Sequence, residues 1–188
     1  MKYCSTCGNE LIRETPPGDN RDRSICAVCN AIHYENPRII AGCIAQWQGR
    51  VLLCRRAIEP HIGSWTVPAG YMENDETMEQ AALREAREET GADISLDALY
   101  SVFDIQAIRQ VYIIYRGVLR SPHLEAGVEC SEVRLFQPAE IPWDNLFYPA
   151  IGDLLRRYKS DLAAGKFTLY TGTSVKGRIA SIERDEIQ

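Results

Sequence analysis

The sequence predicts an α/β domain preceded by a small cysteine-rich module. Two pairs of closely spaced cysteines lie within the first 35 residues, strand-like runs separated by turn residues follow, and two later stretches have helical periodicity. The chain has 188 residues, of which 45% are hydrophobic and 25% charged. This is enough for one domain with a sizeable core and one small module.

The segment 1–35 is predicted to be a zinc ribbon. Cys4-x2-Cys7 and Cys26-x2-Cys29 are separated by 18 residues, which is the spacing of a four-cysteine zinc site. So short a segment buries little core, so metal binding would supply most of its folding free energy. Two disulfides or free thiols are the alternatives, and the absence of an apolar signal segment disfavours disulfides. The other cysteines lie among apolar residues and are expected in the core: Cys43, Cys54 and Cys130.

The segment 36–165 is predicted to be the main domain, and Asn36-Pro37 marks its boundary. One helix is expected from about residue 76 to 90, with Asp75 as its N-cap and Gly91 as its C-terminal left-handed residue. Expected strands cover 38–47, 50–56, 65–67, about 99–105, 110–119 and 132–136. A second amphipathic helix is expected over roughly 146–163. The segment 166–188 is expected to add a strand over 166–171 and a polar tail, loose or used in an oligomer contact, from Ser174.

Three glutamates of the first helix share one face. Glu85, Glu88 and Glu89 have i, i+3, i+4 spacing, and like charges at that spacing repel each other. A cation offsets the repulsion, and carboxylate oxygens suit Mg²⁺ or Mn²⁺. The alternative is a solvated acidic face, which is common on helices. The setting favours the metal site, because a tight loop ending in Pro68 and Gly70 delivers the helix.

The stretch from Gly70 to Ala92 resembles the signature of the Nudix hydrolases, G-x5-E-x7-R-E-U-x-E-E-x-G-U, where U is a bulky aliphatic residue. The fixed residues all occur at the required spacing: Gly70, Glu76, Arg84, Glu85, Glu88, Glu89 and Gly91. The chain departs from the pattern at both U positions, Ala86 and Ala92, which face the core in the family. The resemblance implies an α-β-α sandwich with a mixed sheet, and hydrolysis of a nucleoside diphosphate linked to another group.

The resemblance also implies the roles of the signature residues. Glu85, Glu88 and Glu89 would bind Mg²⁺ or Mn²⁺ together with the backbone carbonyl of Gly70, and which carboxylate acts as the base stays open. Arg84 would hold Glu85 or Glu76 by a charge-assisted hydrogen bond. Glu76 is interpreted as an orienting residue more than as a ligand.

A further acidic residue often completes such a site. Glu132 is the first candidate because it immediately precedes the run Val133–Phe136, and Glu129 is the second; a solvated loop carboxylate is the alternative. Arg55, at the end of a predicted strand, is expected to contact a substrate phosphate or, alternatively, a surface acid. Several aromatic residues could stack on a base, although core positions are commoner for them: Trp65, Tyr71, Phe103 and Tyr112.

Across nearly its whole length the chain is similar to short, zinc-ribbon-containing enzymes of the plant-plastid FAD and ADP-ribose pyrophosphatase type. That similarity favours ADP-ribose or FAD as the substrate, with AMP as a product. The NADH pyrophosphatases also carry a ribbon, but their S-Q-P-W-P-x-P-x-S element is missing here. An NADH or dinucleotide pyrophosphatase, an oxidised-dNTP sanitiser and a non-enzymatic ligand-sensing regulator are the alternatives.

Charge and hydropathy restrict the partners. The net charge of -5 disfavours general nucleic-acid binding. No apolar run approaches the length of a membrane span, so no membrane association is expected. We therefore expect a cytoplasmic enzyme with a small-molecule nucleotide substrate. A homodimer is expected because many ADP-ribose enzymes of the family select their substrates across a dimer interface.

Overall fold

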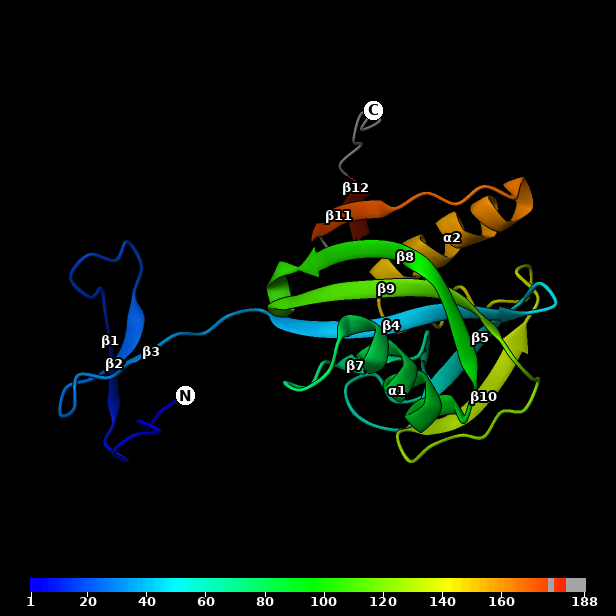
Figure 1. Cartoon of the computed structure of the whole chain (residues 1–188). Helices are drawn as coiled ribbons and strands as arrows, with labels where there is room; N and C mark the ends of the chain where they lie inside the picture. Colours follow the sequence, from blue (N-terminus) through cyan, green and yellow to red (C-terminus); the bar gives the residue numbers. More distant parts are fainter. Residues whose placement is uncertain (176–177, 182–188) are drawn as a thin grey trace. The chain divides into compact units, whose positions relative to one another are not determined.

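The computed structural model describes residues 1–175 and 178–181 (Figure 1). The chain divides into two compact units, Met1–Pro37 and Arg38–Gln188. Within those described ranges, no helix has both the length and the apolar composition needed to cross a membrane.

The first unit is an antiparallel sheet in the order β1-β2-β3. Its strands are β1 (Leu11–Glu14), β2 (Arg23–Cys26) and β3 (Ile32–His33). Cys4 and Cys26 are buried, whereas larger apolar side chains such as Val28 and Tyr34 are exposed. The unit therefore has almost no hydrophobic core of its own.

The second unit is built on a mixed sheet in the order β10-β5-β4-β9-β8-β11-β12, with the short β6 paired to β5 and β7 paired to β4. β4 pairs with β9 in parallel, as β11 does with β8, and the other pairs are antiparallel. The elements are β4 (Arg38–Trp47), β5 (Arg50–Arg56), β6 (Trp65–Thr66), β7 (Ala69–Tyr71), α1 (Met78–Thr90), β8 (Ile94–Ile105), the 3₁₀ turn η1 (Gln106–Ile108), β9 (Gln110–Leu119), β10 (Cys130–Phe136), α2 (Pro149–Ala164), β11 (Tyr170–Val175) and β12 (Arg178–Ser181).

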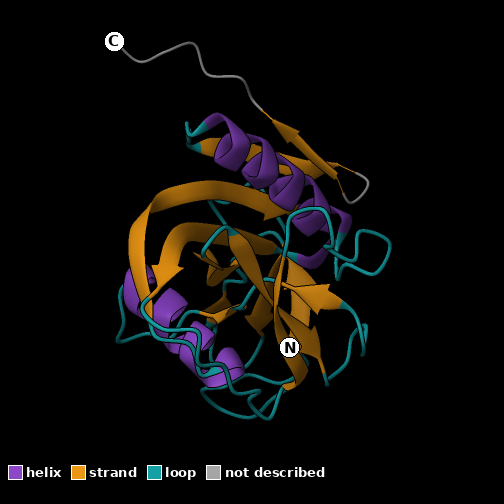
Figure 2. Cartoon of the chain, turned by 90° about the vertical axis from the view of Figure 1, so that its right-hand side faces the viewer, coloured by secondary structure: helices purple, strands orange, loops and turns teal. Residues whose placement is uncertain are grey.

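The helices α1 and α2 cover opposite faces of this sheet (Figures 1 and 2). Under α2 the core is large and aromatic, with Leu154 and Leu155 packed near Tyr100 and Phe103. Under α1 the helix and β4 contribute small side chains to the core, Ala81, Ala82 and Ala86 from the helix and Ala41, Cys43 and Ala45 from β4, and the other strands add larger ones such as Ile113 and Tyr115. Small residues let the helix lie close to the sheet. The expected α-β-α sandwich with a mixed sheet is thus confirmed, and both Ala86 and Ala92 are buried.

Several predicted boundaries were wrong. The first helix begins at Met78 with Thr77, not Asp75, as its N-cap. Strand β8 begins at Ile94, five residues before the predicted start. Register shifts near Ala98 and Ser101 interrupt the alternation of side chains, which hides the first part of the strand in the sequence. The second helix begins at Pro149, since proline lacks an N–H group and suits the first helical position.

The C-terminal prediction was also wrong in part. The expected strand over 166–171 is instead β11 (Tyr170–Val175), and Ser174 lies within it. β11 adds to the edge of β8 in parallel and then pairs with β12. Residues 176–177 and 182–188 of the predicted polar tail lie outside the described part of the chain.

Candidate active site

Both ends of the acidic helix α1 are capped by hydrogen bonds. The Thr77 hydroxyl accepts a hydrogen bond from the backbone N–H of Gln80 at 3.2 Å, and the Gln80 side chain accepts one from the Thr77 N–H at 2.8 Å. This reciprocal capping box satisfies two donors that the first turn would leave unpaired. At the other end, Gly91 adopts φ 64° and its N–H donates to Arg87. The carboxylates of the last two turns are therefore held on a well-defined helix.

Arg84 connects this helix to the loop that precedes it. Its Nε and Nη2 atoms donate to the two oxygens of Glu76 at 2.9 and 2.6 Å, a bidentate pair, and Nη2 also donates to the carbonyl of Tyr71 at 3.0 Å. Its Nη1 atom reaches Glu85 at 2.7 Å and Glu88 at 3.2 Å. The hydrogen bonds from Arg84 lower the pKa of Glu76 to about 2. Arg84 and Glu76 together thus hold the loop and the glutamates in place.

The three clustered carboxylates of α1, Glu85, Glu88 and Glu89, differ strongly in exposure. The side chain of Glu88 is 60% exposed and that of Glu85 only 14%, while Glu89 is buried at 7%. Burial raises the pKa of Glu85, and burial together with the nearby charge of Glu85 raises the pKa of Glu89 to about 8. Glu89 Oε2 accepts a hydrogen bond from the backbone N–H of Ala69 at 3.0 Å. A buried carboxylate next to another acid is an environment that a bound cation would stabilise.

Gly70 lies directly against this cluster. A Cβ atom at Gly70 would overlap the carboxylate of Glu85, so a side chain there would displace the glutamate. The constraint is steric, because this glycine does not have a positive φ. The backbone of β7 consequently lies directly against the carboxylate of Glu85.

A pocket of about 750 Å³ opens over these carboxylates. Its lining includes a group of acidic residues, here called the carboxylate side: Glu73, Glu85, Glu88, Glu89 and Glu129. It also includes aromatic, apolar and basic residues, here called the aromatic side: Ile40, Arg56, Ile58, Pro60, Tyr71, Tyr112, Phe147 and Tyr148. Glu59 and Arg84 line the pocket as well. A site of this volume accommodates a ligand of nucleotide size.

Glu132 and Arg55 do not line this pocket. They are direct partners across β10 and β5 and form an ion pair at 3.6 Å, and Arg55 Nε also donates to the carbonyl of Gly63 at 2.9 Å. The structure thus favours the surface-acid alternative for Arg55. Glu129, the second candidate, lies on the pocket wall, and its charge raises the pKa of both Glu85 and Glu89, after larger contributions from burial.

The loop before β10 explains the position of Glu129. The Gly127 N–H donates to the carbonyl of Glu89 at 3.1 Å, and a Cβ atom at Gly127 would overlap the carbonyl of Glu88. This close approach brings the loop against the end of α1. Sequence reasoning ranked Glu132 first because it immediately precedes the run Val133–Phe136. In the structure, a bulge between Cys130 and Glu132 changes the register of β10 at that point, which the sequence did not indicate.

The aromatic side of the pocket was largely missed by sequence reasoning. The guanidinium of Arg56 lies over the ring of Phe147 at 4.1 Å, and His61 meets Phe147 and Tyr148 edge to face at 5.6 and 5.8 Å. Phe147 falls within the range predicted for the second helix, roughly 146–163, but that helix begins only at Pro149. Of the four aromatic candidates named from the sequence, Tyr71 and Tyr112 line the pocket, whereas Trp65 and Phe103 are buried core residues.

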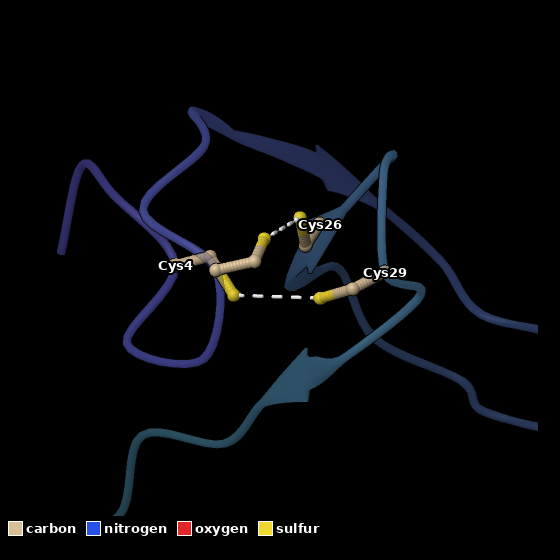
Figure 3. Close-up of side chains that lie close together, drawn as sticks. Cys4, Cys26 and Cys29 are labelled. Atoms are coloured by element: carbon tan, nitrogen blue, oxygen red, sulfur yellow. Dashed lines mark hydrogen bonds between the residues drawn. The ribbon is translucent and has the colours of Figure 1, made fainter.

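The four cysteines of the first unit converge (Figure 3). The Sγ atoms of Cys4 and Cys29 are 3.6 Å apart, those of Cys7 and Cys26 are 3.4 Å apart, and all four lie within 4.8 Å of one another. Disulfide sulfurs would be about 2.05 Å apart, so these are free thiols. Although desolvation opposes it, hydrogen bonds that include His33 lower the pKa of Cys4 to about 5. Hydrogen bonds from Asn9 also lower the pKa of Cys7. Four convergent thiols form a ligand set suited to tetrahedral Zn²⁺.

The main domain matches a known family. The sequence model of the NUDIX domain covers residues 36–158. The chain belongs to the Nudix hydrolase family. A second model, the zinc ribbon described as Nudix N-terminal, covers residues 2–35. The chain is therefore a pyrophosphohydrolase of the Nudix type with an N-terminal zinc-ribbon module, and enzymes of this family use divalent metal ions.

Relatives of this Nudix hydrolase differ in their substrates. A NUDIX hydrolase structure from Nitrosomonas europaea is 45% identical, with a TM-score of 0.89, and the match covers 93% of this chain and 99% of that one. An ADP-ribose pyrophosphatase of Methanocaldococcus jannaschii is 28% identical over 58% of this chain and 67% of its own length. An NAD-capped RNA hydrolase NudC of Vibrio atlanticus is 35% identical over 50% of this chain, which spans only 34% of that relative.

Proposed function

We propose that the enzyme hydrolyses the pyrophosphate bond of ADP-ribose or FAD. With water, ADP-ribose would give AMP and ribose 5-phosphate, and FAD would give AMP and FMN. The observation that carries the proposal is that one pocket is lined both by clustered carboxylates and by aromatic rings. Such a pocket suits a diphosphate at the acids and a planar base at the rings.

On the carboxylate side, Glu85, Glu88, Glu89 and Glu129 would hold Mg²⁺ or Mn²⁺ together with the carbonyl of Gly70. These hard oxygen donors fit such ions, and a bound cation would offset the burial that raises the pKa of both Glu85 and Glu89. A bound divalent ion offsets the charge of the diphosphate and lowers the pKa of a water molecule.

The protein itself would contribute positioning and proton transfer. Arg84 and Glu76 orient the glutamates through the bidentate pair, so they act as positioning residues. Among Glu85, Glu88 and Glu89, Glu88 is the most exposed, and either it or Glu129 is a candidate to accept the proton of the attacking water. Substitution of each one separately would identify the base.

On the aromatic side, Phe147 and Tyr148 are candidates to contact the adenine, and Arg56 to contact a phosphate. Arg56 takes this role in place of Arg55, because Arg56 lines the pocket. Stacking of a base on an aromatic ring contributes about 1–3 kcal/mol in nucleic-acid complexes, which is enough to orient a nucleotide.

Zn²⁺ at Cys4, Cys7, Cys26 and Cys29 is proposed as a structural ion. We expect one zinc per chain in freshly purified protein, measured by elemental analysis. A zinc-free preparation with a folded first unit would contradict the assignment. Glu132, which pairs with Arg55, is no longer proposed as a ligand of the catalytic metal.

The substrate is tested by a panel of ADP-ribose, FAD, NADH and 8-oxo-dGTP, assayed with Mg²⁺ or Mn²⁺ for release of the nucleoside monophosphate. We expect the highest kcat/KM for ADP-ribose or FAD. NADH is the second candidate, because the matched NudC relatives act on NAD-capped RNA. Turnover of 8-oxo-dGTP alone would reject the proposal, and failure on every compound would favour a ligand-sensing role.

The homodimer and the cytoplasmic location are also proposals. Light scattering of the purified chain would test the first, and imaging of a tagged chain in cells the second. A monomer with full activity would reject any need for residues from a second copy in the site.

A further inference from the structure

A second group of thiols lies next to Glu89, one of the carboxylates that line the pocket. Cys54 on β5 and Cys130 at the start of β10 are both buried, and so is Glu89. One ligand atom from each of the three residues lies within 4.8 Å of the others. Sequence reasoning assigned both cysteines to the core, and the Nudix chemistry uses neither of them.

The separation of two of the ligand atoms fits a metal site. Cys54 Sγ lies 3.6 Å from Glu89 Oε2. A tetrahedral Zn²⁺ with bonds of about 2.3 Å to sulfur and about 2.1 Å to oxygen places those two ligand atoms about 3.6 Å apart. Two thiolates and one carboxylate form a softer ligand set than the all-oxygen site beside it, and soft ligands favour Zn²⁺ over Mg²⁺.

The cluster adjoins the pocket. Glu89 lines the pocket, and Cys130 directly follows Glu129, which also lines it. The thiol cluster and the proposed Mg²⁺ or Mn²⁺ site therefore share Glu89. Because one carboxylate would serve both sites, a thiophilic ion at the thiols would compete with the hard ion in the pocket.

We propose that Cys54, Cys130 and Glu89 form an inhibitory site for thiophilic divalent cations such as Zn²⁺. The ion would displace the two thiol protons to solvent and bind as a dithiolate–carboxylate complex. Glu89 would then be withdrawn from the Mg²⁺ or Mn²⁺ site. The binding part stands on the cluster alone, whereas the inhibition rests on the proposed hydrolytic function.

Binding is tested by adding Co²⁺ to the full chain, with Zn²⁺ in the ribbon and Mg²⁺ in excess. Thiolate ligation of Co²⁺ produces a sulfur-to-metal charge-transfer band, which an all-oxygen site does not give. Co²⁺ binds more weakly than Zn²⁺ and should leave the ribbon loaded, and a chelator dye would detect released zinc. We expect the band in the wild type and its loss in both Cys54→Ser and Cys130→Ser.

Cys43→Ser is the matched control, because Cys43 is equally buried in the same domain but lies outside the cluster. It should keep the band. Tryptophan fluorescence would verify that each variant is folded. A wild-type chain without the band, or a band undiminished in the two cluster variants, would overturn the proposal.

Inhibition is tested by titrating Zn²⁺ into the Mg²⁺-supported reaction. The Zn²⁺ concentration for half inhibition should rise at least about tenfold in Cys54→Ser relative to Cys43→Ser, since loss of a supporting ligand typically weakens metal binding by that factor or more. Equal inhibition of the two variants would overturn the inhibitory role. If no substrate is turned over, the Co²⁺ spectrum still decides whether the site exists.

Discussion

The two units of this chain gather metal-ligating residues by opposite means. In the first unit the ligands are almost the whole interior, since Cys4 and Cys26 are buried while neighbouring apolar side chains stay exposed. In the second unit the carboxylates lie on a helix supported by two hydrophobic cores. In the first unit a bound metal would provide the stability that a hydrophobic core usually provides. In the second unit, which has its own core, the metal would serve only the chemistry.

The local backbone reflects the same difference. Each cysteine knuckle ends on a left-handed residue, Gly8 at φ 75° and Asn30 at φ 58°, whose N–H donates to the first cysteine of its pair. These turns present sulfur atoms toward one point. The glutamates instead follow helical spacing, so their separation is fixed by α1 whether or not an ion is bound.

The largest expected effect is the loss of the first unit's fold on removal of its metal. Structural zinc contributes about 10–16 kcal/mol of apparent binding free energy in zinc-finger peptides, far more than this unit can obtain from burial. We expect a chelator to abolish amide-exchange protection in β1–β3. Protection in β4 and β9 should remain, because those strands belong to the packed unit.

Tryptophan fluorescence provides an independent check, because Trp47, Trp65 and Trp143 all lie in the second unit. The denaturation midpoint of the second unit should barely change when the chelator is added. Cys29→Ser should reproduce the loss of protection in β1–β3, whereas Ser5→Ala in the same unit should not. Joint unfolding of both units by the chelator would break the comparison.

In the second unit, removal of a ligand should affect the chemistry more than the fold. Glu89→Gln is expected to lower kcat at least about 100-fold, the effect of losing one electrostatic stabiliser of the transition state. Its denaturation midpoint should not fall in the same proportion. Glu132→Gln is the matched control, since Glu132 is a carboxylate outside the pocket. Similar losses in both variants would remove Glu89 from the metal site.

The sequence predicted most of this site because its information is local. The spacing of Glu85, Glu88 and Glu89 and the order of Arg84 and Glu76 lie within one helix and its loop, where 3.6-residue periodicity fixes the faces. The cysteine knuckles are local in the same way. The α-β-α sandwich followed from the resemblance that these residues carry.

The unpredicted part depends on contacts between distant segments. Glu129 reaches the pocket because Gly127 lies against the end of α1, and nothing near position 129 indicates that contact. The pairing of β5 with β10 brings Cys54 and Cys130 together, and Glu89 joins them from α1. The aromatic side depends on where the second helix begins. Such features follow from register and loop packing, which periodicity does not determine.

A smaller effect should appear in the pH dependence of stability. Burial raises the pKa of Glu89 from an ordinary 4.5 to about 8, so between these values the folded state holds a proton that the unfolded state has released. Stability of the Mg²⁺-free second unit should therefore fall as the pH rises from about 4.5 to about 8. Glu76, whose pKa is lowered to about 2, changes its contribution only below that window.

The measurement is the tryptophan-detected denaturation midpoint across this pH range, with the ribbon loaded. Glu89→Gln cannot ionise and should flatten the slope, and so should saturating Mg²⁺, which favours the carboxylate form in the folded state. An identical slope in the wild type and Glu89→Gln would show that the buried carboxylate does not carry the effect.

The smallest expected effect concerns the cap that positions the acidic helix. Thr77→Ala removes the hydroxyl that accepts from Gln80 and should lower the stability of the second unit by about 1 kcal/mol. Asp75→Ala, at the residue that the sequence favoured as the cap, should cost less, because the helix begins after Thr77. Tryptophan-detected urea denaturation of both variants measures the difference. Since the second unit is held by caps and packing, this loss should be the same with and without the ribbon metal; a loss that depends on that metal would mean that the two units share their stability.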